Sequence, residues 1–134
     1  MSATIKHIEI KGVQIPVIFE EQKALPILNL QLVFQNSGYI QDKNKSGLVS
    51  LSSKLLNEGT KELGATKFAE KLEENAISLT TSNGFETFVI ELSNLKEQSK
   101  KGIELLTALL KSPNYSQNTL DKLKTIQTGS LKRK

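Results

Sequence analysis

Few residues in this chain could do chemistry. His7 is the only histidine, and the sequence contains no cysteine. Zinc sites without cysteine use two or three imidazoles together with carboxylates, so we expect no zinc site built by this chain alone. A Ser-His-Asp group would also depend on His7, which has no obvious serine partner nearby. We interpret His7 as an ordinary residue on the surface or edge of a strand.

The charge pattern argues against nucleic-acid binding. The formal net charge is +4, and all of it lies beyond residue 119, where five basic residues accompany one acidic residue. A basic tail without interleaved aromatic residues is typical of a solvated helix end. No apolar run reaches the length of a membrane span, and the start lacks the apolar stretch of a signal peptide. The compartment stays open, with bacterial cytoplasm and periplasm both compatible.

Alternating apolar residues predict strands in four places. Residues 5–20 read as a hairpin with a turn at Lys11-Gly12, and residues 27–35 alternate again before a polar loop over 36–46. Strand character returns at 77–81 and 85–92, joined by the strong turn signal Asn83-Gly84.

Amphipathic spacing predicts four helices. They cover residues 46–57, 65–74, 95–111 and the stretch from about 116 to the chain end. The order β-β-β-α-α-β-β-α-α indicates an α+β fold, in which helices cover one face of a largely antiparallel sheet. The last helix reaches residue 134 in mid-pattern and without a cap. We therefore expect residues 1–134 to form a single partial domain, truncated at its C-terminal end.

Three ordered segments resemble the pitrilysin/insulinase-like zinc metallopeptidase family, over about residues 6–134. The hairpin KGVQIPVIFEEQ resembles the opening strand pair of that family. The segment NKSGLVSLSSKLLNEGTKELGATKFAEKLEENAISLTTS resembles its central stretch, and LLTALLKSPNYSQNTLDKLKTIQ resembles a later passage of two helices around a proline. The resemblance implies the N-terminal part of a first domain.

The catalytic residues of that family are replaced in this sequence. The family's H-x-x-E-H motif places two zinc-binding histidines and a general-base glutamate on one helix. With Gly47-Leu48 and Gly59-Thr60 as anchors, the histidine positions fall on Ser50 and Lys54, and the glutamate position falls on Ser53. The third ligand, a glutamate in the later helix, falls near Ser130. The resemblance therefore implies a non-catalytic member, without peptidase activity and without zinc of its own.

Two functions are compatible with a retained scaffold and a lost metal site. The first is an inactive subunit, as in processing peptidases, which helps to hold extended peptide while a catalytic H-x-x-E-H partner supplies zinc. The alternative is a purely structural assembly subunit with no role in proteolysis. A third interpretation, an unrelated α+β binding module, predicts a mainly parallel sheet. We also expect self-association through an open strand edge or the last helix.

The positions Ser50, Ser53 and Lys54 leave two structural alternatives open. On a helical wheel they lie opposite the apolar stripe. Taken alone, the residues favour a solvated helix face. The other interpretation is that this face still lines a cleft that contacts peptide or a partner subunit.

Overall fold

The computed structural model describes residues 2–133 and contains the predicted order of elements. The strands and helices are β1 (Thr4–Ile10), β2 (Val13–Phe19), β3 (Ile27–Gln35), α1 (Leu48–Leu56), α2 (Gly64–Glu74), β4 (Ser78–Asn83), β5 (Thr87–Leu95), α3 (Ser99–Lys111) and α4 (Gln117–Lys132). The two short 3₁₀ turns are η1 (Tyr39–Gln41) and η2 (Lys96–Gln98). Within residues 2–133, no helix is both long and apolar enough to cross a bilayer.

Every strand pair is antiparallel, as predicted, but the strands form two sheets rather than one. β1 pairs with β2, and a separate three-stranded sheet has the order β3-β5-β4. This mainly antiparallel arrangement contradicts the expectation for an unrelated module with a parallel sheet. β5 begins at Thr87 rather than at Phe85, because residues 84–86 form the turn that is closed by a hydrogen bond from the Gly84 amide to the Thr87 carbonyl.

The register of the three-stranded sheet separates an apolar face from a polar one. Leu30 of β3 lies opposite Leu92 of β5, which lies opposite Leu79 of β4. The residues between them place Gln31 beside Glu91, and the two side chains form a hydrogen bond of 2.9 Å. Successive side chains point to opposite faces of a strand, so the alternation predicted from the sequence matches the buried and open faces.

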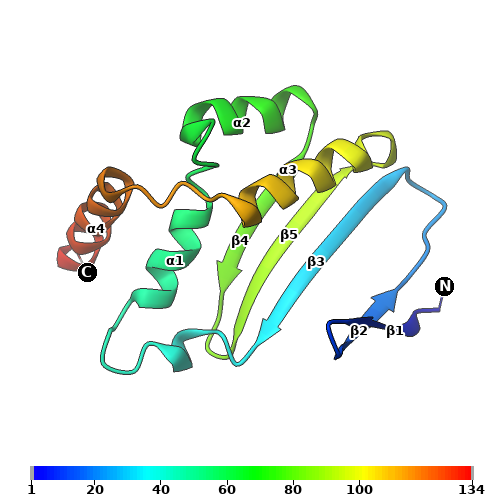
Figure 1. Cartoon of the computed structure of the whole chain (residues 1–134), viewed down its shortest axis with the longest axis horizontal. Coiled ribbons are helices and arrows are strands. Elements are labelled where there is room, and N and C mark those ends of the chain that lie inside the picture. Colours follow the sequence, from blue (N-terminus) through cyan, green and yellow to red (C-terminus); the bar gives the residue numbers. More distant parts are fainter. Residues whose placement is uncertain (1, 134) are drawn as a thin grey trace.

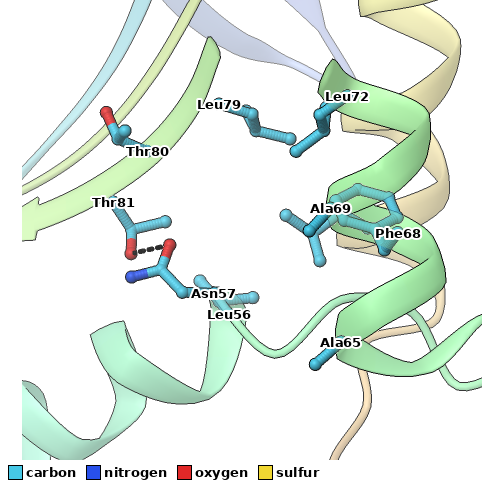
Figure 2. Close-up of a pocket in the computed structure, with 10 residues that line it drawn as sticks. Leu56, Asn57, Ala65, Phe68, Ala69, Leu72, Leu79, Thr80 and Thr81 are labelled. Carbon is cyan, nitrogen blue, oxygen red and sulfur yellow. Dashed lines mark hydrogen bonds between the residues drawn. The ribbon is translucent and has the colours of Figure 1, made fainter. Parts of the chain in front are cut away.

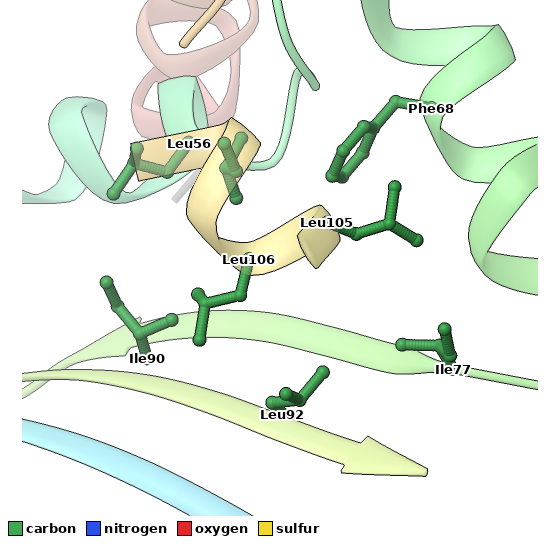
Figure 3. Packing of buried hydrophobic residues seen from close by; sticks show 8 residues of the cluster. Leu56, Phe68, Ile77, Ile90, Leu92, Leu105 and Leu106 are labelled. Atoms are coloured by element: carbon green, nitrogen blue, oxygen red, sulfur yellow. The ribbon is translucent and has the colours of Figure 1, made fainter. Parts of the chain in front are cut away.

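Helices α1, α2 and α3 cover the apolar face of this sheet. Leu106 of α3 points between Ile90 and Leu92 of β5, and Leu105 points toward Phe68 of α2 (Figure 3). Leu92 and Leu109 are fully buried. The core cluster consists of Leu56, Phe68, Ile77, Ile90, Leu92, Leu105, Leu106 and Leu109.

The fourth helix departs from the predicted layer. α4 packs against α1 rather than on the sheet, at one end of the molecule (Figure 1). The side chain of Ser116 caps its first turn by accepting a hydrogen bond of 3.2 Å from the Thr119 amide. As a result, α1 lies between the sheet on one side and α4 on the other.

The loop before α1 fixes where this helix begins. Gly47 has a left-handed backbone (φ 87°), so the helix starts at Leu48, two residues later than predicted. The carboxylate of Asp42 accepts hydrogen bonds of 2.8 Å from the amides of Gly47 and Val49. These amides are among the first-turn groups that have no partner within a helix, and a carboxylate there also complements the helix dipole.

The β1–β2 hairpin stands apart from the rest of the fold (Figure 1). Its strands are almost entirely exposed. Pairing of Ile8 with Ile15 and of Ile10 with Val13 gathers apolar side chains on one face, whereas His7 and Pro16 form a pair on the other. The apolar face consists of Ile8, Ile10, Val13, Ile15, Val17 and Phe19.

Candidate functional site

Two of the α1 positions to which the resemblance assigns the metal site, Ser53 and Lys54, contact β4 and α4. Ser53 is only 5% exposed and lies against β4. The Thr81 hydroxyl donates a hydrogen bond of 2.8 Å to the Ser53 carbonyl oxygen. The two hydroxyl oxygens lie 3.2 Å apart, and the same Thr81 hydroxyl lies 3.1 Å from Oδ1 of Asn57 (Figure 2). The position that the resemblance assigns to a general base is thus a neutral hydroxyl held by the neighbouring strand.

Lys54 is joined to the last helix. Its Nζ donates a hydrogen bond of 3.1 Å to Oε1 of Gln127, and Nε2 of Gln127 donates one of 3.2 Å to the Gly47 carbonyl oxygen. One turn earlier on α4, Lys122 forms an ion pair of 2.9 Å with Glu58. We call the Lys54–Gln127 and Glu58–Lys122 pairs the α1–α4 clamp.

The prediction from the residues alone, that this helix face is solvated, is wrong for Ser53 and Lys54. Ser53 is buried, and Lys54 and Ser50 are each half-buried. The reason is that Thr81 of β4 lies against Ser53 and Gln127 of α4 reaches Lys54, on the side of α1 that a helical wheel leaves open. Ser130 is exposed, and Gln127, one turn before it, is the α4 residue that reaches α1. Sequence reasoning missed Gln127, although its spacing of four from the apolar Leu123 places it on the same side of the helix.

The donor groups at these positions do not fit zinc. Serine hydroxyls and an amide are poor substitutes for imidazole and carboxylate ligands, and a lysine ammonium has no lone pair and repels a cation. Within residues 2–133, no three His, Asp or Glu side chains gather closely enough to hold a metal ion. His7 lies in the exposed hairpin, opposite Pro16.

A groove lies beside these positions, between β4 and α2. Its volume is about 370 Å³, and Ala65, Ala69 and Leu72 of α2 face Leu79 and Thr81 of β4 across it (Figure 2). The remaining lining residues are Leu56, Asn57, Phe68, Thr80 and Leu109. Among the described strands, β4 pairs only with β5, so its other edge is free. A free strand edge offers unpaired backbone donors and acceptors to an extended peptide.

Comparison with known proteins places this geometry in context. No protein-family model matches the chain. The "Non-peptidase homolog YmxG" of Helicobacter pylori is 44% identical over 133 residues, which are 99% of this chain and 31% of that protein. The chain therefore spans about a third of the length of this curated relative.

Solved structures share the fold at low sequence identity. The peptidase M16 inactive domain from Pseudomonas fluorescens superimposes with a TM-score of 0.84 at 20% identity, covering 97% of this chain and 32% of that one. The chain has the M16 peptidase fold. A protease from Helicobacter pylori has the same fold, with a TM-score of 0.76 at 16% identity, covering 93% of this chain and 30% of that one. The periplasmic protease PqqL from Escherichia coli also shares it, with a TM-score of 0.73 at 15% identity, covering 98% of this chain and 15% of that one.

These similarities confirm the resemblance to a non-catalytic member of the metallopeptidase family. The fold is that of M16 peptidase structures, and the relative with the higher identity is named a non-peptidase homologue. The resemblance assigns the ligand and base positions on α1 to Ser50, Ser53 and Lys54, which carry hydroxyl and ammonium groups. The chain therefore shares the fold of M16 peptidase structures and is similar in sequence to a protein named a non-peptidase homologue.

Proposed function

We propose that this chain supports substrate binding and assembly in a proteolytic complex whose zinc is supplied by a catalytic H-x-x-E-H partner. The observation that carries the proposal is the free edge of β4 beside the groove lined by α2, next to α1 positions that no longer fit a metal. The proposal therefore assigns the holding of an extended peptide to this chain and its cleavage to the partner.

The chemistry of the groove suggests what it would hold. An extended peptide that pairs with the edge of β4 presents alternate side chains toward α2. The alanine and leucine side chains there favour a small or medium apolar group. The hydroxyls of Thr80 and Thr81 lie at the strand side of the groove. The substrate class is therefore an extended peptide with an apolar residue at the position facing α2.

Peptide binding can be tested by filling the groove. Ala69 is exposed and faces the groove, so Ala69→Phe occupies it without displacing the core. We expect at least a tenfold loss of affinity for a fluorescently labelled extended apolar peptide, measured by anisotropy. Glu70→Phe adds the same ring on the outward side of α2 and should leave affinity within twofold. Equal effects of both variants, or no binding by the wild-type chain, would favour the purely structural assembly role.

Partner assembly needs a separate measurement. Affinity purification of the tagged chain from its native source should recover a protein that carries an intact H-x-x-E-H motif. Zinc should co-purify with that partner. Metal analysis of the chain purified alone should find far less than one zinc per molecule. Stoichiometric zinc in the isolated chain would contradict the proposal directly.

A further inference from the structure

Gln127 of α4 connects both ends of α1. Its Oε1 accepts a hydrogen bond of 3.1 Å from the Lys54 ammonium, and its Nε2 donates one of 3.2 Å to the Gly47 carbonyl oxygen. Gly47 and Lys54 lie two helical turns apart on one face of the helix. The Gly47 carbonyl points toward the end of the helix and the Lys54 side chain leans back toward its start. The two groups therefore meet the amide near the middle of this face, where the half-buried Ser50 also lies.

The groups at the two ends of this contact match an amide. The Lys54 ammonium can only donate hydrogen bonds, and the Gly47 carbonyl oxygen can only accept them. A glutamine amide carries an acceptor and two donors in one plane, so a single side chain satisfies both ends. A divalent cation in the place of the amide would instead be repelled by the charge of Lys54.

Gly47 allows Gln127 to come this close. Its backbone is left-handed (φ 87°), and a Cβ there would lie 2.6 Å from Nε2 of Gln127. A larger residue at position 47 would therefore push the amide away from the carbonyl oxygen. Gln127 is half-buried against α1, whereas Ser130, to which the resemblance assigns the third zinc ligand, is exposed.

We propose that the Gln127 amide takes the place of a metal bridge between α1 and α4, and that the Lys54 ammonium keeps divalent cations out of this junction. The loss of ligands on α1 is then matched by a new contact that holds the same two helices together. Gln127, rather than Ser130, is the α4 residue that faces Ser50 and Lys54. This inference depends neither on peptide binding nor on a partner, so either proposal can fail without the other.

Placing metal ligands in the chain tests which residue of α4 faces α1. The first variant combines Ser50→His and Lys54→His with Gln127→Glu. Two histidines four residues apart on one helix face can bind a single ion, and the carboxylate supplies a third ligand. The matched control keeps both histidine changes but carries Ser130→Glu in place of Gln127→Glu. Every chain, including the reference, also carries His7→Asn, so that no native histidine contributes.

Cobalt(II) is titrated into each chain, and the visible absorption of the bound ion gives the dissociation constant. We expect no binding by the reference chain, and binding by the Gln127→Glu variant that is at least about tenfold tighter than binding by the Ser130→Glu variant. Equal affinities, tighter binding with Ser130→Glu, or no binding by either variant would overturn the proposed position of Gln127. Cobalt binding by the reference chain that Gln127→Met abolishes would overturn the exclusion of cations.

The amide bridge can also be tested without a metal, in case the histidine variants do not fold. Gln127→Met keeps the length of the side chain and removes both hydrogen bonds. We expect amide exchange in α4 and in the first turn of α1 to accelerate by about fivefold or more. Gln117→Met is the matched control, because Gln117 is exposed and bonds only Asp121 of the same helix. It should change exchange in α1 by less than about twofold. Unchanged exchange in the Gln127→Met variant would overturn the proposal.

Discussion

Ser53 and Thr81 illustrate how a few neutral groups hold α1 against the sheet. The Thr81 hydroxyl donates to the Ser53 carbonyl oxygen, and the Ser53 side chain, 5% exposed, meets the same hydroxyl. A buried hydroxyl without a partner costs free energy, so these groups stabilise the fold chiefly as a matched set. Ionised ligands at this place would need a metal to offset their charge, whereas serine and threonine need only each other.

Removing one hydroxyl of this set should lower the free energy of unfolding by more than one hydrogen bond contributes, because it leaves the other hydroxyl buried without its partner. Thr81→Val keeps the shape of the side chain but removes the hydroxyl, and we expect the free energy of unfolding to fall by about 1–2 kcal/mol. Urea denaturation measures this change. Adding Ser53→Ala should cost less than the sum of the two single changes, since no buried hydroxyl is then left alone. Thr80→Val, on the exposed face of the same strand, should change stability by less than about 0.5 kcal/mol.

Gly59 is required for two separable reasons. Its backbone is left-handed (φ +76°), and a Cβ there would overlap the Gly64 carbonyl oxygen and lie 2.8 Å from the Cβ of Phe68. Gly12 has a similar φ of +80° with open space around it. We expect Gly12→Ala to cost about 1 kcal/mol and Gly59→Ala to cost at least about 2 kcal/mol more, from overpacking against α2. Equal costs in thermal or urea unfolding would show that the close contact is unimportant.

At the scale of elements, α4 is attached differently from the other helices. Among residues 117–132, Leu123 is the buried one, and the α1–α4 clamp supplies polar contacts on either side of it. The ion pair contributes little by itself, because Lys122 is 55% exposed and solvent screens it. Most of the attachment must therefore come from Leu123 and from the hydrogen bonds of Gln127.

Truncating Leu123 should release α4 while leaving the sheet intact. Leu123→Ala is expected to remove about 2–3 kcal/mol of local stability, so amide exchange should accelerate in α4 but not in β5. Ile126→Ala, on the exposed side of the same helix, is the matched control and should change exchange little. If β5 loses protection together with α4, the helix is part of the cooperative core rather than a separate unit.

The elements themselves could be predicted because their patterns are local. Alternation in residues 27–35 and helical spacing in 65–74 each identify an element and its buried face without knowledge of the fold. The burial of Ser53 could not be predicted, since it depends on Thr81 of β4, which lies 28 residues further along the chain. The contact of Gln127 with Lys54 could not be predicted either, because 73 residues separate the two. Nor does local alternation tell which strands pair, so the division into two sheets was missed.

At the scale of the whole molecule, the chain exposes 9863 Å², whereas a compact monomer of 14.8 kDa exposes about 7,000 Å². This difference should appear in the denaturant dependence of unfolding. The unfolded chain would expose about 21,000 Å², so folding buries about a fifth less surface than expected for a compact protein of this mass. The urea m-value scales with the surface exposed on unfolding. We expect it to be about a fifth below the value typical of 134 residues, when measured at low concentration to keep the chain monomeric. A full-size m-value would indicate that the open surface is closed in solution.

The clamp also has a practical consequence for work on mixed complexes. Hydrogen bonds and one ion pair connect α1 and the residues just after it to β4 and α4, and we expect no metal ion to contribute to these contacts. Adding EDTA should therefore leave the melting temperature of the isolated chain unchanged. In a complex with a zinc-bearing subunit, any change in melting or exchange after chelation would originate in that subunit. The chain would then serve as an internal reference, because chelation is expected to leave its own melting temperature unchanged.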